Sequence, residues 1–306
     1  MPGSRRHEPS SPRRSPCRAS SAAARPPARQ SWEALRVFAR NPSAVAGVLL
    51  LAVILAVTIF GPMAMQADPF EIAGAPMSPP GEDALLGTDY LGRDVLTGMV
   101  YGGRATLLVG VVAAVLSMAI GLTVGALAGY YGGWIDETLM RITEFFQVLP
   151  TLLFAMVLVT LFSPSLATIA VAIGVVSWTG TARLARGEFL RLKRREYVLA
   201  ERVIGAGDAR IIWRVILPNA LAPLIVSATL AIGMAILFEA GLSFLGLGDP
   251  NIMSWGLMIG SNRPYILTAW WAVTLPGAAI FLTVLAVSLI GDGLNDALNP
   301  NSRGRA

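Results

Sequence analysis

Charged, cysteine and histidine side chains are scarce in this sequence of 306 residues. Only 14% of the residues are charged and 54% are apolar, whereas a soluble domain has ~25% charged residues. A surface that faces water on all sides cannot be built from so few charges, so we expect an integral membrane protein. The one cysteine, Cys17, and the one histidine, His7, exclude an intrachain disulfide and a metal site built from cysteine and histidine ligands.

Sequence patterns for nucleotide hydrolysis and for serine hydrolases are also missing. The single lysine, Lys193, is followed by Arg194 and lacks the glycines that precede the lysine of a phosphate-binding Walker loop. The chain has no Gly-x-Ser-x-Gly elbow and no histidine beyond His7 that could activate a serine. We therefore expect no catalytic site, no metal and no cofactor bound by this chain.

Six long apolar runs dominate what is present. A helix rises about 1.5 Å per residue and needs ~20 residues to cross ~30 Å of hydrocarbon. Because lipid cannot satisfy backbone polar groups, the runs should be helices and the fold should be all-α. The predicted spans are residues 44–60, 106–128, 145–162, 166–182, 220–238 and 270–290, within one transmembrane domain at 44–300.

The distribution of positive charge predicts the orientation of these spans. Loops rich in arginine and lysine stay in the cytoplasm. With a cytoplasmic N-terminus, 21 of the 24 basic residues lie inside, and only Arg93, Arg104 and Arg263 lie outside. We therefore expect both termini in the cytoplasm.

The segments that flank the transmembrane domain are polar. Residues 1–30 are rich in arginine, serine and proline, which is typical of a disordered tail, and a short tail is expected at 301–306. Residues 31–43 predict an interfacial helix, because Trp32, Leu35 and Phe38 recur at helical spacing beside arginines. Asn41 and Pro42 are suited to cap and begin the first span.

The longest predicted cytoplasmic loop, residues 183–217, holds nine basic and four acidic side chains. Its pattern predicts two short amphipathic helices hinged near Gly205 and Gly207. Leu217 and Pro218 predict a break before the next span, because proline disfavours helical geometry at the preceding residue. Two interpretations are open on the residues alone: basic side chains that lie among lipid phosphates, or helices that dock into a groove of a partner.

Two further stretches have a chemically distinct pattern. Residues 86–94 concentrate glycine and aspartate around Arg93, which favours a solvated turn with a local ion pair. Glu239 directly follows the fifth predicted span, and a charge in mid-bilayer is costly. It is either a group on a transport pathway or a capped group at the outer interface.

Gly121, Gly125 and Gly129 recur every four residues on one face of the second predicted span. This spacing lets a neighbouring helix backbone approach closely. We expect these glycines to serve helix packing.

Several separated motifs together resemble one family. The string LGTDYLGRD at residues 86–94 is similar to a signature of the family, and GYYGG at 129–133 resembles the end of its second span. Residues 197–219 are similar to its cytoplasmic coupling loop, with Gly205, Leu217 and Pro218 in register. The last third matches at EAGLSFLG (239–246), WG (255–256), WW (270–271), PG (276–277) and GDGL (291–294). Over residues 31–300 the chain resembles the permeases of binding-protein-dependent ABC importers, specifically the second permease of the dipeptide, oligopeptide and nickel group.

The resemblance implies a type I importer permease in the cytoplasmic (inner) membrane of a prokaryote. Its partners would be a sister permease, two ATP-binding subunits that hold ATP and Mg²⁺, and an extracytoplasmic solute-binding protein; no nucleic acid is implied. Peptides would be the solute, with nickel or another small solute as the alternative. It implies ATPase-coupling residues at Tyr197, Val198, Leu199, Ala200, Glu201, Gly205, Ala206, Asp208, Arg210, Leu217 and Pro218. It also marks family positions without an assigned role at Gly87, Thr88, Asp89, Gly92, Arg93, Asp94, Glu239, Ser243, Phe244 and Gly246.

The coupling loop departs from the family pattern at three positions. Leu199 and Glu201 occupy the first and third places of a Glu-Ala-Ala triplet, and Val215 stands where the group has histidine. Contacts of those side chains cannot be carried over. The rival functions are a secondary transporter, which would need buried charges near the midplane, and a non-transporting membrane scaffold.

Overall fold

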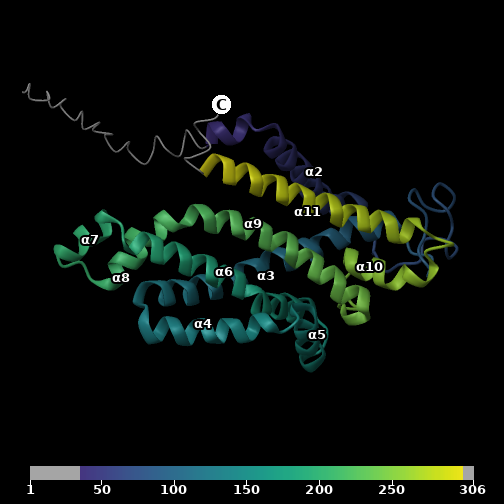
Figure 1. The fold of residues 1–306 in the computed structure, drawn as a ribbon. Helices are drawn as coiled ribbons and strands as arrows, with labels where there is room; N and C mark the ends of the chain where they lie inside the picture. Colours follow the sequence, from purple (N-terminus) through teal and green to yellow (C-terminus); the bar gives the residue numbers. More distant parts are fainter. Residues whose placement is uncertain (1–34, 299–306) are drawn as a thin grey trace, which may run out of the picture.

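The computed structural model describes residues 35–298, and most of them lie in helices (Figure 1). The expected tails at 1–30 and 301–306 lie outside the described residues. Strand-like pairing is confined, in the described range, to two isolated bridges, Ile72 with Arg93 and Thr88 with Asp94. The α-helices are α2 (Pro42–Met65), α3 (Val95–Tyr131), α4 (Gly133–Val148), α5 (Thr151–Phe162), α6 (Leu166–Lys193), α7 (Glu196–Val203), α8 (Asp208–Arg210), α9 (Leu217–Leu242), α10 (Trp255–Asn262) and α11 (Trp271–Leu298). Two π-helical turns, η1 (Ile211–Ile216) and η2 (Ser243–Leu247), flank α9, and a 3₁₀ turn, η3 (Arg263–Tyr265), follows α10.

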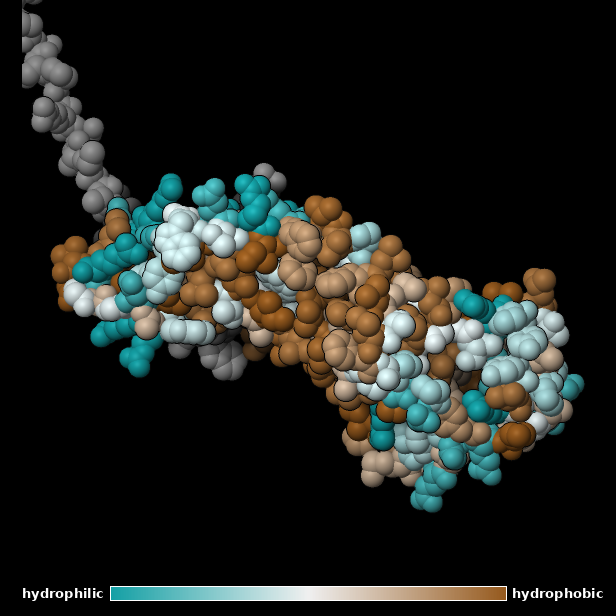
Figure 2. Space-filling view, turned by 90° about the horizontal axis from the view of Figure 1, so that it is seen from below, coloured by the Kyte–Doolittle hydropathy of each residue, from teal (hydrophilic) through white to brown (hydrophobic). Residues whose placement is uncertain are grey.

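Five helical stretches within residues 35–298 are long and apolar enough to cross a membrane. They are α2, α3, α6, the continuous stretch Asp208–Leu247 and α11. Most extend beyond the predicted spans, because a helix continues into the polar layer where the apolar pattern has already ended. Figure 2 shows the result on one face: apolar side chains gather over the middle of the molecule and hydrophilic ones over its two ends.

The predicted span at 145–162 is wrong as a single helix. It straddles the break between α4 and α5, which meet at 86°. Pro150 causes the break, because its ring disfavours helical geometry at Leu149, whose φ of −71° and ψ of 129° are extended. By length and composition this bent pair, in which polar α4 leads into apolar α5, is either a broken sixth span or a re-entrant loop.

The central helix pair is α3 and α6, and glycines bring it together as predicted. A Cβ atom added at Gly121 would lie 2.6 Å from the Cβ of Thr181, and one at Gly125 would lie 2.3 Å from the Ala182 carbonyl oxygen. Gly129 continues the same contact. Any larger residue at these positions would force the two backbones apart.

Helices α2 and α11 lie side by side along one flank (Figure 1). Asn41 accepts hydrogen bonds from the amides of Ser43 and Ala44 and so caps α2, which confirms the predicted start. Its side-chain amide also donates to Asp296 of α11 at 3.1 Å. Residues 35–40, in the predicted interfacial helix at 31–43, are helical; residues 31–34 lie outside the described range.

At its other end α2 is fixed to α3 by an arginine. Pro62 cannot donate the N–H that would bond to the carbonyl of Thr58. Arg104 replaces that donor: its Nε donates to the Thr58 carbonyl oxygen at 2.8 Å, and its Nη2 donates to that of Ile59 at 2.5 Å. The Thr58 carbonyl that the proline leaves unpaired is thus satisfied from a neighbouring helix.

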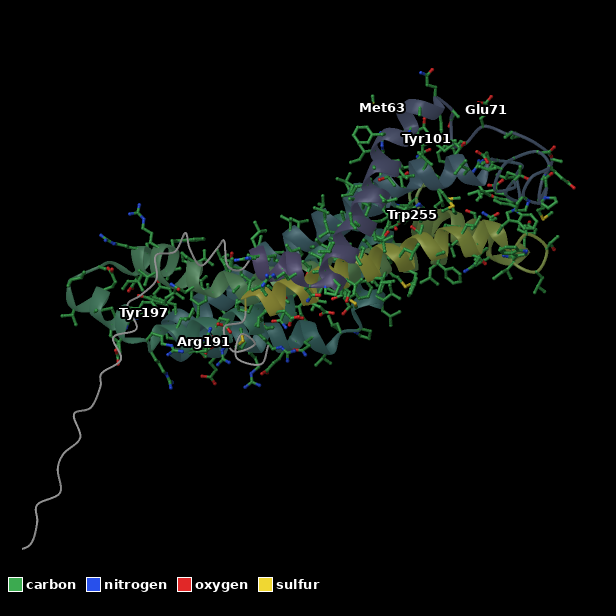
Figure 3. The ribbon with its side chains drawn as sticks, turned by 90° about the horizontal axis from the view of Figure 1, so that it is seen from above. Met63, Glu71, Tyr101, Arg191, Tyr197 and Trp255 are labelled. Atoms are coloured by element: carbon green, nitrogen blue, oxygen red, sulfur yellow. The ribbon has the colours of Figure 1, made fainter. Side chains whose placement is uncertain are left out.

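The candidate site residues from the sequence lie at the two ends of the bundle. Figure 3 places Tyr197 and Arg191 at one end, and Met63, Glu71 and Tyr101 at the opposite end. The first end carries α7 and α8. The second carries α10 and the long connection between α2 and α3, residues 66–94, which is called here the capping lobe.

Candidate functional site

Helix α7 is anchored on one side and leaves an apolar tip free. Val198 is fully buried among core residues of α3, α6 and η1. On the other side Tyr197 and Leu199 are about half exposed, and Val203 and Ile204 at the tip are 87% and 75% exposed. Exposed aliphatic residues at a polar end of a membrane protein are typical of a surface that another protein covers.

A glycine turn ends α7. Gly205 has a φ of +85°, which L side chains rarely adopt, and a Cβ added there would meet nothing within 4 Å. The amides of Gly205 and Ala206 bond back to the carbonyls of Arg202 and Glu201. The backbone conformation, not space, therefore requires glycine here. Gly207 also has open space but a φ of −68°.

A tyrosine joins this loop to α3. The hydroxyl of Tyr130 donates to Asp208 Oδ1 at 2.5 Å, and Lys193 donates to the Tyr130 carbonyl oxygen. The guanidinium of Arg202 lies 5.3 Å from the centre of the same ring. Tyr130 thus contacts residues at the end of α6, in α7 and in α8. Sequence reasoning did not select it, although it stands in the GYYGG string that drew attention.

The predicted break at Leu217 and Pro218 is wrong. Residues 208–247 form one helical stretch of 40 residues, kinked only near its end at Gly246, and it is called here the α8–α9 rod. The π-helical turn η1 accommodates Pro218 without a break in the helix. In this turn the amide of Leu217 donates to the carbonyl of Ile212, one residue further back than in an α-helix. The Asn219 side-chain amide then donates to the Val215 carbonyl oxygen at 2.7 Å. The last ten residues of the predicted loop, 208–217, therefore continue into the span as one helix.

The loop itself is shorter than predicted. Residues 183–193 belong to α6, so the connection spans residues 194–207 and contains α7. The two helices predicted around Gly205 are α7, within this connection, and the first turn of the α8–α9 rod, directly after it. The remaining predicted coupling residues lie along the same end, with Ala200 and Arg210 exposed and Glu201, Ala206 and Leu217 half-buried.

A bidentate ion pair braces the helices behind this end. Arg186 of α6 donates to both carboxylate oxygens of Asp136 in α4, at 2.5 and 2.7 Å. The planar guanidinium fixes the relative rotation of the two helices, which a single contact would not.

At the opposite end, the motif at residues 86–94 ties the capping lobe together. Thr88 is fully buried; its hydroxyl donates to the Ala75 carbonyl oxygen at 2.6 Å and accepts from the Ser78 amide. Its own carbonyl oxygen accepts from Trp271 Nε1 at 3.1 Å. Gly87 and Gly92 both have positive φ, at +78° and +83°, where the chain turns.

The solvated turn with an ion pair predicted for this motif is wrong. Asp89 is only 7% exposed and accepts from the amides of Leu91 and Arg93 at 2.8 Å. Asp94 caps α3 by accepting from the amides of Leu96 and Thr97. Both carboxylates are thus used by backbone N–H groups, and Arg93 lies over the ring of Phe70, 5.0 Å from its centre, without an ion pair to either aspartate in the described structure.

Glu239 lies inside α9, not just beyond the span as predicted, and is 1% exposed. Three hydroxyls donate to its carboxylate: Ser243 and Ser254 to Oε1, at 2.9 and 2.8 Å, and Thr106 to Oε2 at 3.2 Å. Ser254 caps α10, so the carboxylate faces the N-terminal end of that helix. The Glu239 carboxylate is therefore a buried, hydrogen-bonded contact between α3, α9 and α10. Of the two alternatives from the sequence, the capped group fits this arrangement.

The other family positions complete this end. Ser243 begins η2, and Gly246 has a φ of +86° at its kink. Arg263 donates to the Phe244 carbonyl oxygen at 3.0 Å and lies over its ring. The structure therefore brings residues 87–94 and 239–246 to one end, linked through α10 by the Tyr90 amide and Asn262 Oδ1 at 3.1 Å. It places residues 197–218 at the other end.

Metal ligands do not gather at either end: among residues 35–298 no three Asp, Glu, His or Cys side chains are arranged to hold an ion.

Comparisons with known proteins agree along most of the chain. The model of a family described as binding-protein-dependent transport system inner membrane component matches residues 121–304, and that of the N-terminal TM domain of oligopeptide transport permease C matches residues 30–80. A chain of the MetNI methionine ABC transporter, solved in inward-facing conformations, aligns with a TM-score of 0.57 at 22% identity, over 66% of this chain and 96% of that one. That likeness concerns the fold.

Similar curated proteins are peptide permeases. The di/tripeptide transport system permease protein of Pseudomonas aeruginosa is 40% identical, over 92% of this chain and 94% of its own length. Two proteins of Bacillus subtilis follow: the dipeptide permease at 41% identity, over 91% of this chain and 88% of its own, and the oligopeptide permease at 36%, over 89% and 90%. The chain therefore belongs to the binding-protein-dependent transport system inner membrane components, and it is an integral inner-membrane permease subunit of an ABC importer.

Proposed function

We propose that the transported solute is a peptide, either a dipeptide or a longer one. The observation that carries this proposal is that the three relatives named above, 36–41% identical to this chain, are all named for peptide transport. Nickel or another small solute is the alternative within the same family.

In the proposed complex this chain pairs with a sister permease, two ATP-binding subunits and an external solute-binding protein. ATP and Mg²⁺ are held by the ATP-binding subunits, and this chain binds no cofactor and has no catalytic site. The excess of arginine supports a cytoplasmic position for α7, α8 and both termini. The exposed Val203 and Ile204 support contact with the ATP-binding subunits at this end.

Transport would proceed by alternating access, with movement entering through α7. Closure of the ATP-binding pair presses on the tip of α7, and two contacts pass the displacement inward: the buried Val198 and the hydrogen bond from Tyr130 to Asp208. Because Asp208 begins the α8–α9 rod, the displacement reaches α9 as a rigid-body motion.

An ion-gradient transporter is the rival that the structure bears on most directly. Such a protein needs ionisable groups that face its pathway. Glu239 is buried in a candidate span, but three hydroxyls of this chain satisfy it and seal it from solvent. This arrangement favours a structural joint over an ion relay.

Reconstitution of the complex tests the proposal. The chain would be co-expressed with a candidate sister permease, ATP-binding subunits and binding protein from the same organism, then placed in proteoliposomes with labelled dialanine, trialanine or Ni²⁺. We expect ATP-dependent uptake of a peptide, and no ATPase activity from this chain purified alone. Uptake of Ni²⁺ only, uptake driven by an ion gradient without ATP, or no uptake at all would reject the peptide importer.

A further inference from the structure

An open groove of about 540 Å³ lies beside the capping lobe, at the end of the bundle opposite α7. Four segments form it: residues 68–70 of the capping lobe, the first half of α3, the start of α6 and the connection between η2 and α10. Figure 3 places one of its residues, Tyr101, at this end together with Met63 and Glu71. The volume falls within the usual range for sites that bind small organic molecules.

The polarity of the groove changes with depth in the membrane. Arg104 stands just before the apolar run of α3 that begins at residue 106, and Asp68 belongs to the polar connection after α2. Leu108 lies one helical turn further into the apolar run and is about half exposed, and Leu166 and Ile252 add apolar surface. The groove therefore crosses the border between the polar layer and the hydrocarbon, and its charges lie on the polar side. A ligand that fits both parts has a charged head and an apolar tail.

The positive charge in the groove is held in a fixed orientation. Arg104 donates through Nε and Nη2 to the carbonyl oxygens of Thr58 and Ile59, and its Nη1 donates to no acceptor within residues 35–298. The Arg104 side chain is exposed. Because a guanidinium binds phosphate oxygens well, Arg104 can accept a phosphate without giving up its bonds to α2.

A negative charge faces the same groove. Asp68 Oδ1 accepts from the Phe70 amide at 2.8 Å, which fixes the carboxylate, and Oδ2 accepts no hydrogen bond in the described part of the chain. Asp68 is exposed and makes no ion pair with Arg104 in this part either. The two opposite charges thus line one groove without neutralising each other. A zwitterion, whose cation and anion lie a few bonds apart, would satisfy both.

We propose that this groove binds one phospholipid with a zwitterionic headgroup that ends in a primary ammonium. The phosphate lies against Arg104, the ammonium donates to Asp68, and an acyl chain runs along Leu108. A lipid without the ammonium would match Arg104 alone and would bring its negative charge close to Asp68. The groove is therefore selective for phosphatidylethanolamine over phosphatidylglycerol. This inference does not depend on which solute the protein transports.

Two variants alter the groove, and each has a matched control. Asp68→Asn removes the charge but keeps the oxygen that accepts from Phe70. Glu71→Gln makes the same change at an exposed residue of the capping lobe that does not line the groove. Leu108→Trp fills the apolar part of the groove, and Val115→Trp adds the same bulk at a similarly exposed position two turns along α3 and outside the groove.

The experiment maps where lipid binds to the purified complex. The complex in detergent is incubated with phosphatidylethanolamine or phosphatidylglycerol that carries the same photoreactive acyl chain, and the adducts are located by peptide mass spectrometry. We expect adducts at residues 101–108, 166 and 251–253, about fivefold more with phosphatidylethanolamine, the worth of one exposed ion pair. Asp68→Asn should label equally with both lipids, and Leu108→Trp should lower labelling about threefold or more. Both control variants should label as the unaltered complex does.

Three results would overturn the proposal. Equal labelling of the unaltered complex by both lipids would show that only unselective membrane lipid fills the groove. Absence of adducts at the groove would show that the sister permease covers it. Competition by free phosphoethanolamine, which has the headgroup but no acyl chain, would identify a site for a soluble molecule. Labelling is measured without transport, so a failure of the peptide function would leave this test unaffected.

Discussion

Gly205 and Gly207 stand two residues apart in the coupling loop, and both have open space around them, but their backbones differ. A side chain at Gly205 must adopt a φ of +85°, which costs about 1–2 kcal/mol, whereas Gly207 has an ordinary φ of −68°. We expect Gly205→Ala to lower uptake per ATP hydrolysed about fivefold, and Gly207→Ala to leave it unchanged. Equal coupling in both variants, measured in proteoliposomes, would contradict a role for this turn.

Tyr130 provides the second test at this scale. Tyr130→Phe keeps the ring beneath Arg202 but removes the hydrogen bond to Asp208. Because Asp208 is exposed, the loss should amount to about 1 kcal/mol, and uptake per ATP should fall about fivefold while the ATP-binding subunits still bind. The neighbouring, half-exposed Tyr131 gives the control: Tyr131→Phe should couple normally. A Tyr130→Phe variant with full coupling would show that the displacement reaches the α8–α9 rod by another contact.

Glu239 should matter for stability more than for transport chemistry. Glu239→Ala leaves three hydroxyl donors without an acceptor and opens a void, so we expect a loss of about 3 kcal/mol or more in the free energy of unfolding. Glu239→Gln retains one acceptor oxygen and should lose less, and Glu82→Ala in the exposed part of the capping lobe should lose nothing. Thermal unfolding of the purified complex ranks the three variants. Equal stability of Glu239→Ala and Glu82→Ala would contradict a structural role for the buried, hydrogen-bonded Glu239 carboxylate.

At the scale of elements, the continuity of the α8–α9 rod is the feature to test. Two glycines inserted between Ile216 and Leu217 would interrupt it just before α9. We expect uptake per ATP to fall about tenfold or more, because the pressure on the loop is then absorbed by the flexible joint. Pro218→Ala, which adds an N–H and leaves the rod continuous, should transport normally. The ratio of uptake to ATP hydrolysis distinguishes the two, and a coupled insertion variant would contradict rigid transmission.

The elements that follow from apolar length alone were predicted well from the sequence. The caps at Asn41 and the packing glycines of α3 were also predicted, because both depend on local residue types. The continuity through Pro218 was not, since it depends on a π-helical turn whose register no residue pattern announces. The bend at Pro150 was hidden inside a run that is apolar throughout its second half.

The candidate sites were predicted unevenly for a similar reason. The coupling loop stands out by its charge and its glycines, which the sequence displays directly. The partners of Arg93 and Glu239 could not be predicted, because they come from segments distant in the sequence. Arg93 lies over Phe70, and Glu239 accepts hydrogen bonds from Thr106 and Ser254. The neighbouring Asp89 and Asp94 suggested an ion pair for Arg93, but in the structure both carboxylates accept hydrogen bonds from backbone amides.

For the whole molecule, the two polar ends should face opposite compartments. In a Cys17→Ser background the chain has no other cysteine, so single cysteines can report each end. We expect Ile204→Cys to react with a membrane-impermeant maleimide only from the cytoplasmic side, and to be shielded when the ATP-binding subunits are present. Leu85→Cys, in the exposed part of the capping lobe, should react only from the outside. Labelling of both positions from one side would overturn the proposed orientation.

The pairing of α2 with α11 has a consequence for how the protein is made. The hydrogen bond from Asn41 to Asp296 joins residues 255 positions apart. At a synthesis rate of ~5–20 residues per second, α2 waits roughly 13–50 s for its partner. Arg104 of α3 arrives much earlier and holds the other end of α2 meanwhile. The pairing of α2 with α11 therefore begins at the capping lobe and proceeds toward Asn41 and Asp296, where it is completed only after α11 has been synthesised.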